Sequence, residues 1–215
     1  MTATAILFDC EFLVCDGAPG RFWCGPGDPD PTVVQIGAVR LTLEPPFDLG
    51  ETFERVIQPR DRTGQPVPLD PLFTRLTGLT QARVAAEGVP LATVLAAFDT
   101  YSEGAPLWSW GKDEFNLIAI SCFVEGLPPP IPATRFHNAA RLLEKAGEPR
   151  DRIHDLRSHT LMAAFGLTPP EGRAHDALTD ARHVALTLQH LLRSGRLTPS
   201  DFAVPNGLRC PRARL

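Results

Sequence analysis

Five side chains in three distant segments have the types that metal-assisted hydrolysis requires. Asp9 and Glu11 lie in ILFDCEF, Asp113 follows WSWGK, and His175 and Asp180 lie in HDALTD. Four carboxylates supply the charge that balances two divalent cations, through the hard oxygen ligands that magnesium and manganese prefer. A histidine, with an ordinary pKa of about 6.5, can accept the proton of an attacking water. These five side chains therefore predict a site for two Mg²⁺ or Mn²⁺ ions.

The first pair of acids lies in a segment with the alternation of a strand. Because side chains two apart on a strand share a face, Asp9 and Glu11 would project together, about 6.6 Å apart at their backbones. Two-metal sites hold their ions about 3.5–4 Å apart, within reach of such a pair. The strand is apolar enough to be central, where two acids are costly unless a cation neutralises them. The alternative is an edge strand with two solvated acids.

The C-terminal segment begins a helix with a packed face. Its apolar residues follow the spacing of three and four and are Ala177, Ala181, Val184, Leu188 and Leu191. Asp180 lies at the border of this stripe, and His175 precedes it, where a loop can bring it over a reacting centre. Asp176 between them is ambiguous, because Asp at this position commonly caps a helix. A histidine at a helix start is also more often structural than catalytic.

The middle segment leaves its acid undecided. Residues 106–110 are typical of a short strand, Gly111 ends it, and Asp113 would lie in the first turn of a helix. We prefer Asp113 because it lies one turn before Leu117, over the end of a packed face. Glu114 is the alternative, and a carboxylate in a first turn is favourable without any metal.

The order of these motifs resembles the DEDDh 3'-to-5' exonucleases, a superfamily of proofreading and RNA-trimming enzymes. Asp-x-Glu on a first strand, a mid-chain Asp after a strand and His-x4-Asp near the C-terminus carry the resemblance. Residues 34–39 and 52–59 look like the second and third strands of the family, and 76–80 like the following turn. The resemblance spans residues 4–194 and is greatest to the small stand-alone exonucleases of the enhanced-RNAi and histone-mRNA-trimming type, and to their bacterial counterparts.

The resemblance implies a ribonuclease H-like α/β fold and a role for each residue. Asp9, Glu11, Asp113 and Asp180 would hold the two ions, and His175 would be the general base. Phe12 and Leu13 would lie beside the terminal nucleotide, with Leu76 and Thr77 across from them. Ordinary core packing is the alternative for these four side chains, since stacking on a base and packing in a core use the same residue types.

Two departures from the family pattern stand out. The turn of residues 111–113 is shorter than in many relatives, which keeps the choice between Asp113 and Glu114 open. A Gly/Pro-rich insertion, residues 16–31, separates the first two strands. Its Phe22 and Trp23 could stack on a base or anchor the loop, and anchoring is the more common use.

Composition is consistent with a nuclease without identifying one. The 215 residues include 21 Lys and Arg against 25 Asp and Glu, giving a net charge of −4, which is accounted for by the four proposed ligands. This balance argues against a tight coating of nucleic acid. Residues 135–157 carry a local basic surplus that is either a solvated face or a track for phosphates. With 43% hydrophobic residues, the chain can bury one good-sized core.

The cysteines favour a reducing compartment. Five are present without a CxxC pair, Cys10 is expected to pack inside the first strand, and Cys15 and Cys24 flank the insertion and could clip it together. No signal-like or membrane-spanning run is found in the sequence, so we expect a cytoplasmic protein without a membrane partner.

The predicted elements describe one exonuclease domain, residues 1–195, and a basic tail, 196–215, that contains Arg209, Arg212 and Arg214. Strands are expected near 4–13, 33–43, 51–58, 106–110 and 152–156. Helices are expected at 70–77, 90–102, 113–125, 136–146, 159–165 and 175–194. Together they predict a mixed five-stranded sheet with helices on both faces.

Three functions fit the sequence. We favour a 3'-to-5' exonuclease that releases nucleoside monophosphates from single-stranded RNA or DNA ends. A non-catalytic nucleic-acid-binding module on a nuclease fold and a hydrolase of very short oligonucleotides are the alternatives. RNA and DNA differ at the 2'-hydroxyl, and motif spacing does not reveal contacts to that group.

Overall fold

A mixed five-stranded sheet forms the centre of the molecule, in a computed structural model that describes residues 3–203. The strand order is β3-β2-β1-β4-β5. The strands are β1 (Thr4–Phe12), β2 (Val33–Thr42), β3 (Leu49–Val56), β4 (Leu107–Ser109) and β5 (Phe136–Asn138). β1 is antiparallel to β2 and parallel to β4. The predicted central position of β1 is confirmed, and the edge-strand alternative for its two acids is excluded.

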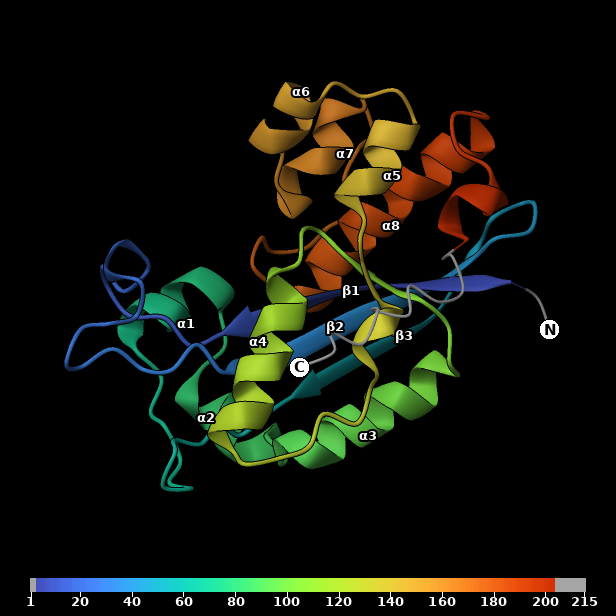
Figure 1. Cartoon of the computed structure of the whole chain (residues 1–215). Coiled ribbons are helices and arrows are strands. Elements are labelled where there is room, and N and C mark those ends of the chain that lie inside the picture. Colours follow the sequence, from blue (N-terminus) through green and yellow to red (C-terminus); the bar gives the residue numbers. More distant parts are fainter. Residues whose placement is uncertain (1–2, 204–215) are drawn as a thin grey trace, which may run out of the picture.

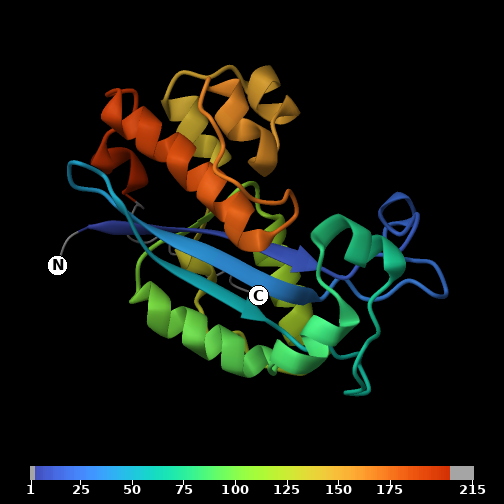
Figure 2. The same ribbon diagram turned by 180° about the vertical axis from the view of Figure 1, so that it is seen from behind.

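Helices cover both faces of this sheet (Figure 1, Figure 2). On one side lie α5 (Ala140–Lys145), α6 (Arg150–Asp155), α7 (Leu161–Ala164) and α8 (Ala177–Arg193). On the other lie α3 (Leu91–Ser102) and α4 (Asp113–Val124), while α1 (Pro71–Thr77) and α2 (Gln81–Glu87) pack near the ends of β1 and β2. Four short 3₁₀ turns, Pro19–Arg21, Ala133–Arg135, Ser158–Thr160 and Pro199–Phe202, complete the elements of the described residues.

The alternation along β1 divides the core between the two faces. Ala5 and Leu7 pack in the cluster formed with α8, and Ile6 and Phe8 in the cluster formed with α3 and α4. Because strand side chains alternate, Asp9 and the following odd residue continue the row that faces α8. The same pattern that builds the core thus directs the carboxylates toward the start of that helix.

One strand and two helices differ from the sequence-based prediction. The fifth strand was expected near 152–156, but that segment is helix α6, and the strand is Phe136–Asn138, where we expected a helix to begin. Only three residues pair with β4, too few for alternation to be visible. The apolar spacing of residues 139–146 belongs to α5, which starts at Ala140. Helix α2 was not predicted.

The chain packs on the core beyond the predicted domain end. Leu197 and Phe202 are both 2% exposed, so packing continues to at least Phe202, while the arginines of the predicted tail lie outside the described residues. Cys15 and Cys24 are free thiols, as expected for reduced cysteines, and do not clip the insertion together. None of the helices between residues 3 and 203 has the length and apolarity needed to span a membrane.

Candidate active site

Four acidic side chains are buried where β1, α4 and α8 meet. Asp9 is 9% exposed, Glu11 8%, Glu114 7% and Asp180 3%. The end of β1 lies between the first turns of α4 and α8 (Figure 1). Three segments that are far apart in the sequence therefore contribute carboxylates to one buried cluster, which we call the acid cluster.

Burial and mutual repulsion both oppose ionisation of the acid cluster. Burial raises the pKa of Asp9 well above its ordinary value, and the charges of Glu114 and Glu11 raise it further. The pKa of Glu11 rises to about 8, through burial and then Asp180, and burial raises that of Glu114 to about 7. Burial also raises the pKa of Asp180. Such a cluster is stabilised by cations.

Two oxygens of the acid cluster have no hydrogen-bond donor among residues 3–203. They are Glu114 Oε2 and Asp180 Oδ1, both buried. A buried oxygen without a donor costs about 1–3 kcal/mol, and folded proteins rarely leave one unpaired. Because magnesium and manganese prefer oxygen ligands, the four carboxylates of the acid cluster, with their two unpaired oxygens, fit two divalent cations.

The structure distinguishes the two candidates for the third acid. Both lie in the first turn of α4, but Asp113 is exposed and Glu114 is buried. Successive helical residues point about 100° apart, so only one of them can face β1. Glu114, the alternative in the sequence, joins the acid cluster, and Asp113, which we preferred, lies outside it.

His175 lies at the open side of the acid cluster. One of its ring nitrogens and one carboxylate oxygen each of Glu11 and Asp180 lie within 4.8 Å of one another. Its backbone has a φ of 60°, a region that non-glycine residues seldom adopt and that recurs at functional sites. The imidazole is exposed to solvent, as a residue that meets a substrate must be.

Gln35 on β2 fixes the start of α8 beside the acids. It is fully buried and lies opposite Glu11 in the sheet register. Its Oε1 accepts from the Ala177 N–H at 3.2 Å, and its Nε2 donates to Asp176 Oδ2 at 3.3 Å. Asp176 also caps the helix by accepting from the N–H of Thr179 at 2.9 Å, which confirms the capping interpretation. The sequence analysis missed Gln35, although a polar residue inside the apolar run VVQIGAV was a visible signal.

Gly37 lets α8 approach the sheet directly. It pairs with Asp9 across β1 and β2. A Cβ at this position would lie 2.1 Å from the Leu178 backbone nitrogen and 2.3 Å from the Ala177 carbonyl carbon. These are backbone atoms and cannot swing aside. Contact between the two backbones therefore sets the distance from the acids of β1 to the first turn of α8.

A second histidine and a serine surround the Asp180 side of the site. The rings of His159 and His175 have centroids 5.6 Å apart, and Ser158 Oγ donates to Asp180 Oδ2 at 3.3 Å. His183 Nδ1 lies 3.9 Å from Asp180 Oδ1. None of the three was singled out from the sequence, because no motif marks them.

The four residues expected at the substrate end divide into two pairs. Leu76 is 39% exposed and Phe12 is half-buried, with its ring centroid 6.1 Å from that of Trp23. Leu13 and Thr77 are buried. The Thr77 hydroxyl is occupied within its own helix end, donating to the Phe73 carbonyl at 3.0 Å. Only the first pair presents side-chain surface.

An arginine connects Leu76 to the loop that carries the catalytic candidate His175. The Arg173 guanidinium donates to the carbonyl oxygens of Leu76, at 3.2 Å, and of Arg75. The loop before α8 is thereby attached to the end of α1. This contact brings the expected substrate-end residue and the histidine loop to the same side of the molecule.

Comparison with solved structures identifies the architecture. The nuclease domain of 3'hExo, a DEDDh family member bound to rAMP, is 20% identical and matches with a TM-score of 0.73 over 90% of this chain and 94% of that one. A second match is a 3'-exonuclease whose structure shows 3'-end specific recognition of a histone mRNA stem-loop. It is 18% identical, with a TM-score of 0.70 over 90% of this chain and 83% of that one.

A third match is the zinc-bound complex of E. coli ExoI with single-stranded DNA, at 17% identity and a TM-score of 0.61. It covers 90% of this chain and 41% of that longer one. No protein-family model matches this chain, and no curated protein matches it. The structural matches confirm the predicted fold, and the chain has the ribonuclease H-like architecture of the DEDDh 3'-exonucleases.

Proposed function

We propose that this protein is a metal-dependent 3'-to-5' exonuclease that releases nucleoside monophosphates from single-stranded RNA or DNA. The observation that carries the proposal is the acid cluster with His175 at its open side. The similarity in fold to nucleases bound to a nucleotide and to single-stranded DNA supports the substrate class.

The four carboxylates would hold two Mg²⁺ or Mn²⁺ ions. Asp9, Glu11 and Asp180 are the ligands expected from the sequence, and Glu114 takes the place of Asp113. When bound, the ions would supply Lewis acidity for activating water and for stabilising charge on the departing 3' oxygen.

His175 is the proposed general base. An imidazole nitrogen accepts the proton of the attacking water as the new P–O bond forms and the bond to the 3' oxygen of the preceding nucleotide breaks. His159 lies beside it and would hold the imidazole in place. The exposed position of His175 gives a nucleotide access to the same nitrogen.

The terminal nucleotide would lie against Phe12 and Leu76, the two of the four expected residues that present side-chain surface. Stacking on an apolar side chain contributes about 1–3 kcal/mol per base and requires no particular sequence. Leu13 and Thr77 would act from beneath, supporting these two surfaces rather than touching the base.

The test is hydrolysis of end-labelled single strands of 5 and 30 nucleotides with manganese and with chelator. We expect stepwise release of mononucleotides from the 3' end in manganese and none in chelator. The variant His175→Ala should lose about 10²–10⁴-fold in turnover and retain manganese binding measured by calorimetry. Asp9→Ala should weaken both.

His154→Ala is the matched control, because His154 is an exposed histidine whose side chain is 88% accessible and which lies outside the cluster. Nearly normal turnover of His175→Ala would contradict the assignment. Cleavage of the 5-mer alone would favour a hydrolase of short oligonucleotides, and binding without release under any metal condition would favour a non-catalytic module.

A further inference from the structure

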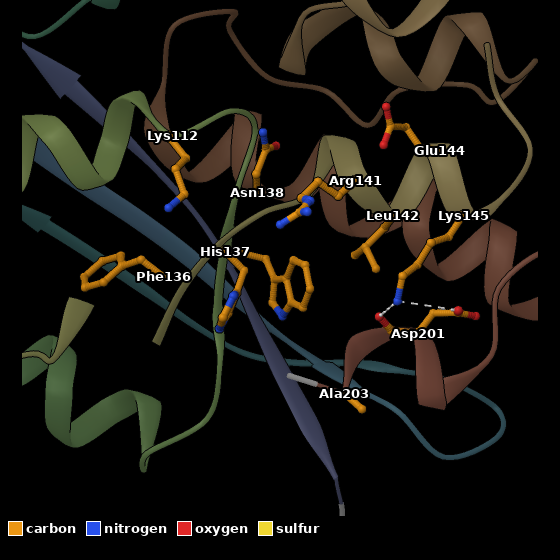
Figure 3. Close-up of a pocket in the computed structure, with 11 residues that line it drawn as sticks. Lys112, Phe136, His137, Asn138, Arg141, Leu142, Glu144, Lys145, Asp201 and Ala203 are labelled. Carbon is orange, nitrogen blue, oxygen red and sulfur yellow. Dashed lines mark hydrogen bonds and ion pairs between the residues drawn. The ribbon is translucent and has the colours of Figure 1, made fainter. Parts of the chain in front are cut away.

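A pocket of about 530 Å³ lies beside β5, at the edge of the sheet. Its apolar side is formed by Trp108, Phe136 and Leu142, and its polar side includes Lys112, His137 and Arg141. Figure 3 shows Lys112, His137 and Arg141 among the side chains around this pocket. We call this cavity the edge pocket.

The edge pocket has a surplus of positive charge. Its two acids are already paired: Glu144 accepts from Arg150 at 2.7 Å, and Asp201 lies 3.7 Å from Lys145 Nζ. Within residues 3–203, Lys112 and Arg141 form no ion pair, and both are exposed. Two cations without counter-charges therefore face one cavity.

His137 lies within reach of both cations. Its pKa is lowered, first by burial and then by the charges of Lys112 and Arg141. Near neutral pH the imidazole is therefore uncharged, and its ring packs 4.9 Å from that of Trp108, centroid to centroid. A neutral aromatic surface next to two cations matches a nucleotide, which joins a flat base to an anionic phosphate.

The edge pocket and the acid cluster share one loop. Asn138 in the pocket accepts from the Gly111 N–H at 3.1 Å and from the Ala140 N–H at 2.9 Å. Gly111 and Lys112 lead directly into the first turn of α4, which carries Glu114. A strand whose 3' end lies at the acid cluster can therefore pass over this loop to the pocket.

We propose that the edge pocket binds one nucleotide of a single strand, with its phosphate between Lys112 and Arg141 and its base against His137. This inference rests on the proposed function in taking the strand to be the substrate, upstream of the bond that is cut. A free mononucleotide has the same chemistry and is the other possible source.

The test is binding of a fluorescent single-stranded 20-mer in chelator at low salt, where no hydrolysis occurs. The double variant Lys112→Gln/Arg141→Gln should bind at least tenfold more weakly than the wild type. Its slope of log affinity against log salt should be shallower by about 0.7, the contribution of one neutralised phosphate in a single strand. In manganese, the loss in kcat/KM should be larger for the 20-mer than for a dinucleotide, which lacks the upstream nucleotides.

The matched control is Arg55→Gln/Arg193→Gln, which removes the same charge from exposed positions on β3 and at the end of α8. An equal loss of affinity in the control would mean that net charge, and not the edge pocket, determines the affinity for the strand. That result would overturn the proposal. Unchanged binding of the 20-mer by the pocket variant, or no binding by the wild type, would also overturn it.

Titration with uridine monophosphate distinguishes the two sources. Tight binding of the free nucleotide that is lost in the pocket variant, with the 20-mer unaffected, would replace the strand by a mononucleotide as ligand. Because affinity is measured without metal, absence of hydrolysis would contradict the proposed function and leave this test intact.

Discussion

The acid cluster and the edge pocket lie on either side of the loop at residues 110–112, and they differ in burial as well as in the sign of their charge. In the acid cluster every carboxylate is less than 10% exposed, and the pKa values of all four are raised. In the edge pocket both unpaired cations are exposed to water. Burial makes like charges costly until a counter-ion binds, whereas solvated cations cost the fold little. The acid cluster is therefore stabilised when protons or cations neutralise it, whereas the exposed cations of the edge pocket stabilise the fold little by binding an anion.

The largest expected effect tests which acid belongs to the cluster. Glu114→Gln should lower turnover by about 10²–10³-fold, because a metal's contribution is several kcal/mol and each 1.36 kcal/mol is a factor of ten. Asp113→Asn, one residue away, should stay within about threefold of the wild type. Steady-state hydrolysis of a labelled single strand measures both. The reverse order would return the third ligand to Asp113.

A smaller effect concerns stability without metal. The pKa of Glu11 is raised from 4.5 to about 8 and that of Glu114 from 4.5 to about 7, so the folded protein binds more protons than the unfolded chain between pH 4.5 and 8. In chelator, these two groups should therefore stabilise the fold increasingly as pH falls through this window, by at most about 1.4 kcal/mol per pH unit for each proton. Manganese should remove the trend.

Urea unfolding at pH 8 and pH 5.5 measures this dependence, and Glu11→Gln isolates the carboxylate. The comparison of Glu11→Gln with the wild type is needed because two histidines have the opposite effect on stability. The pKa values of His137 and His183 are lowered from 6.5 by burial, so these groups destabilise the fold as they gain protons at lower pH. We expect Glu11→Gln to be more stable than the wild type at pH 8 and to lose most of that advantage at pH 5.5. Equal stability of the two proteins at pH 8 in chelator would contradict a costly buried charge.

The smallest effect is expected at the edge pocket. Lys112→Gln/Arg141→Gln should change the free energy of unfolding by no more than about 0.5 kcal/mol, since both residues are exposed and unpaired. Urea unfolding in chelator gives the value. A larger loss would mean that these cations support the fold, and the contrast with the acid cluster would no longer hold.

The sequence was most informative where a periodic pattern is long. Nine residues of β1 and seventeen of α8 show their alternation and apolar stripe clearly enough to predict the strand that carries Asp9 and Glu11 and the helix that carries Asp180. The three-residue strand β5 has no such pattern, and the helical spacing that follows it concealed the strand. Local periodicity identifies long elements and is silent on short ones.

The sequence left the third acid open between Asp113 and Glu114, although the predicted helix start agrees with that of α4, because periodicity does not say which residue of a first turn faces the sheet. One residue changes the direction of a side chain by about 100°, enough to exchange Asp113 for Glu114. Gln35 and Arg173 were not predicted because they bind segments about a hundred or more residues away in the sequence. His159 was not predicted because its role depends on the packing of its ring near that of His175. Spacing along the chain contains no information on such contacts.

Helix α8 packs directly on Gly37 of β2, and this contact bears on the ions that the proposed site can bind. No side chain separates the helix from strand β2 at Gly37, so the two backbones are in direct contact and cannot move closer together. For the proposed ions, the spacing of the backbone segments that carry the ligands is therefore set when the chain folds, and only rotation of the carboxylates is left to adjust to an ion.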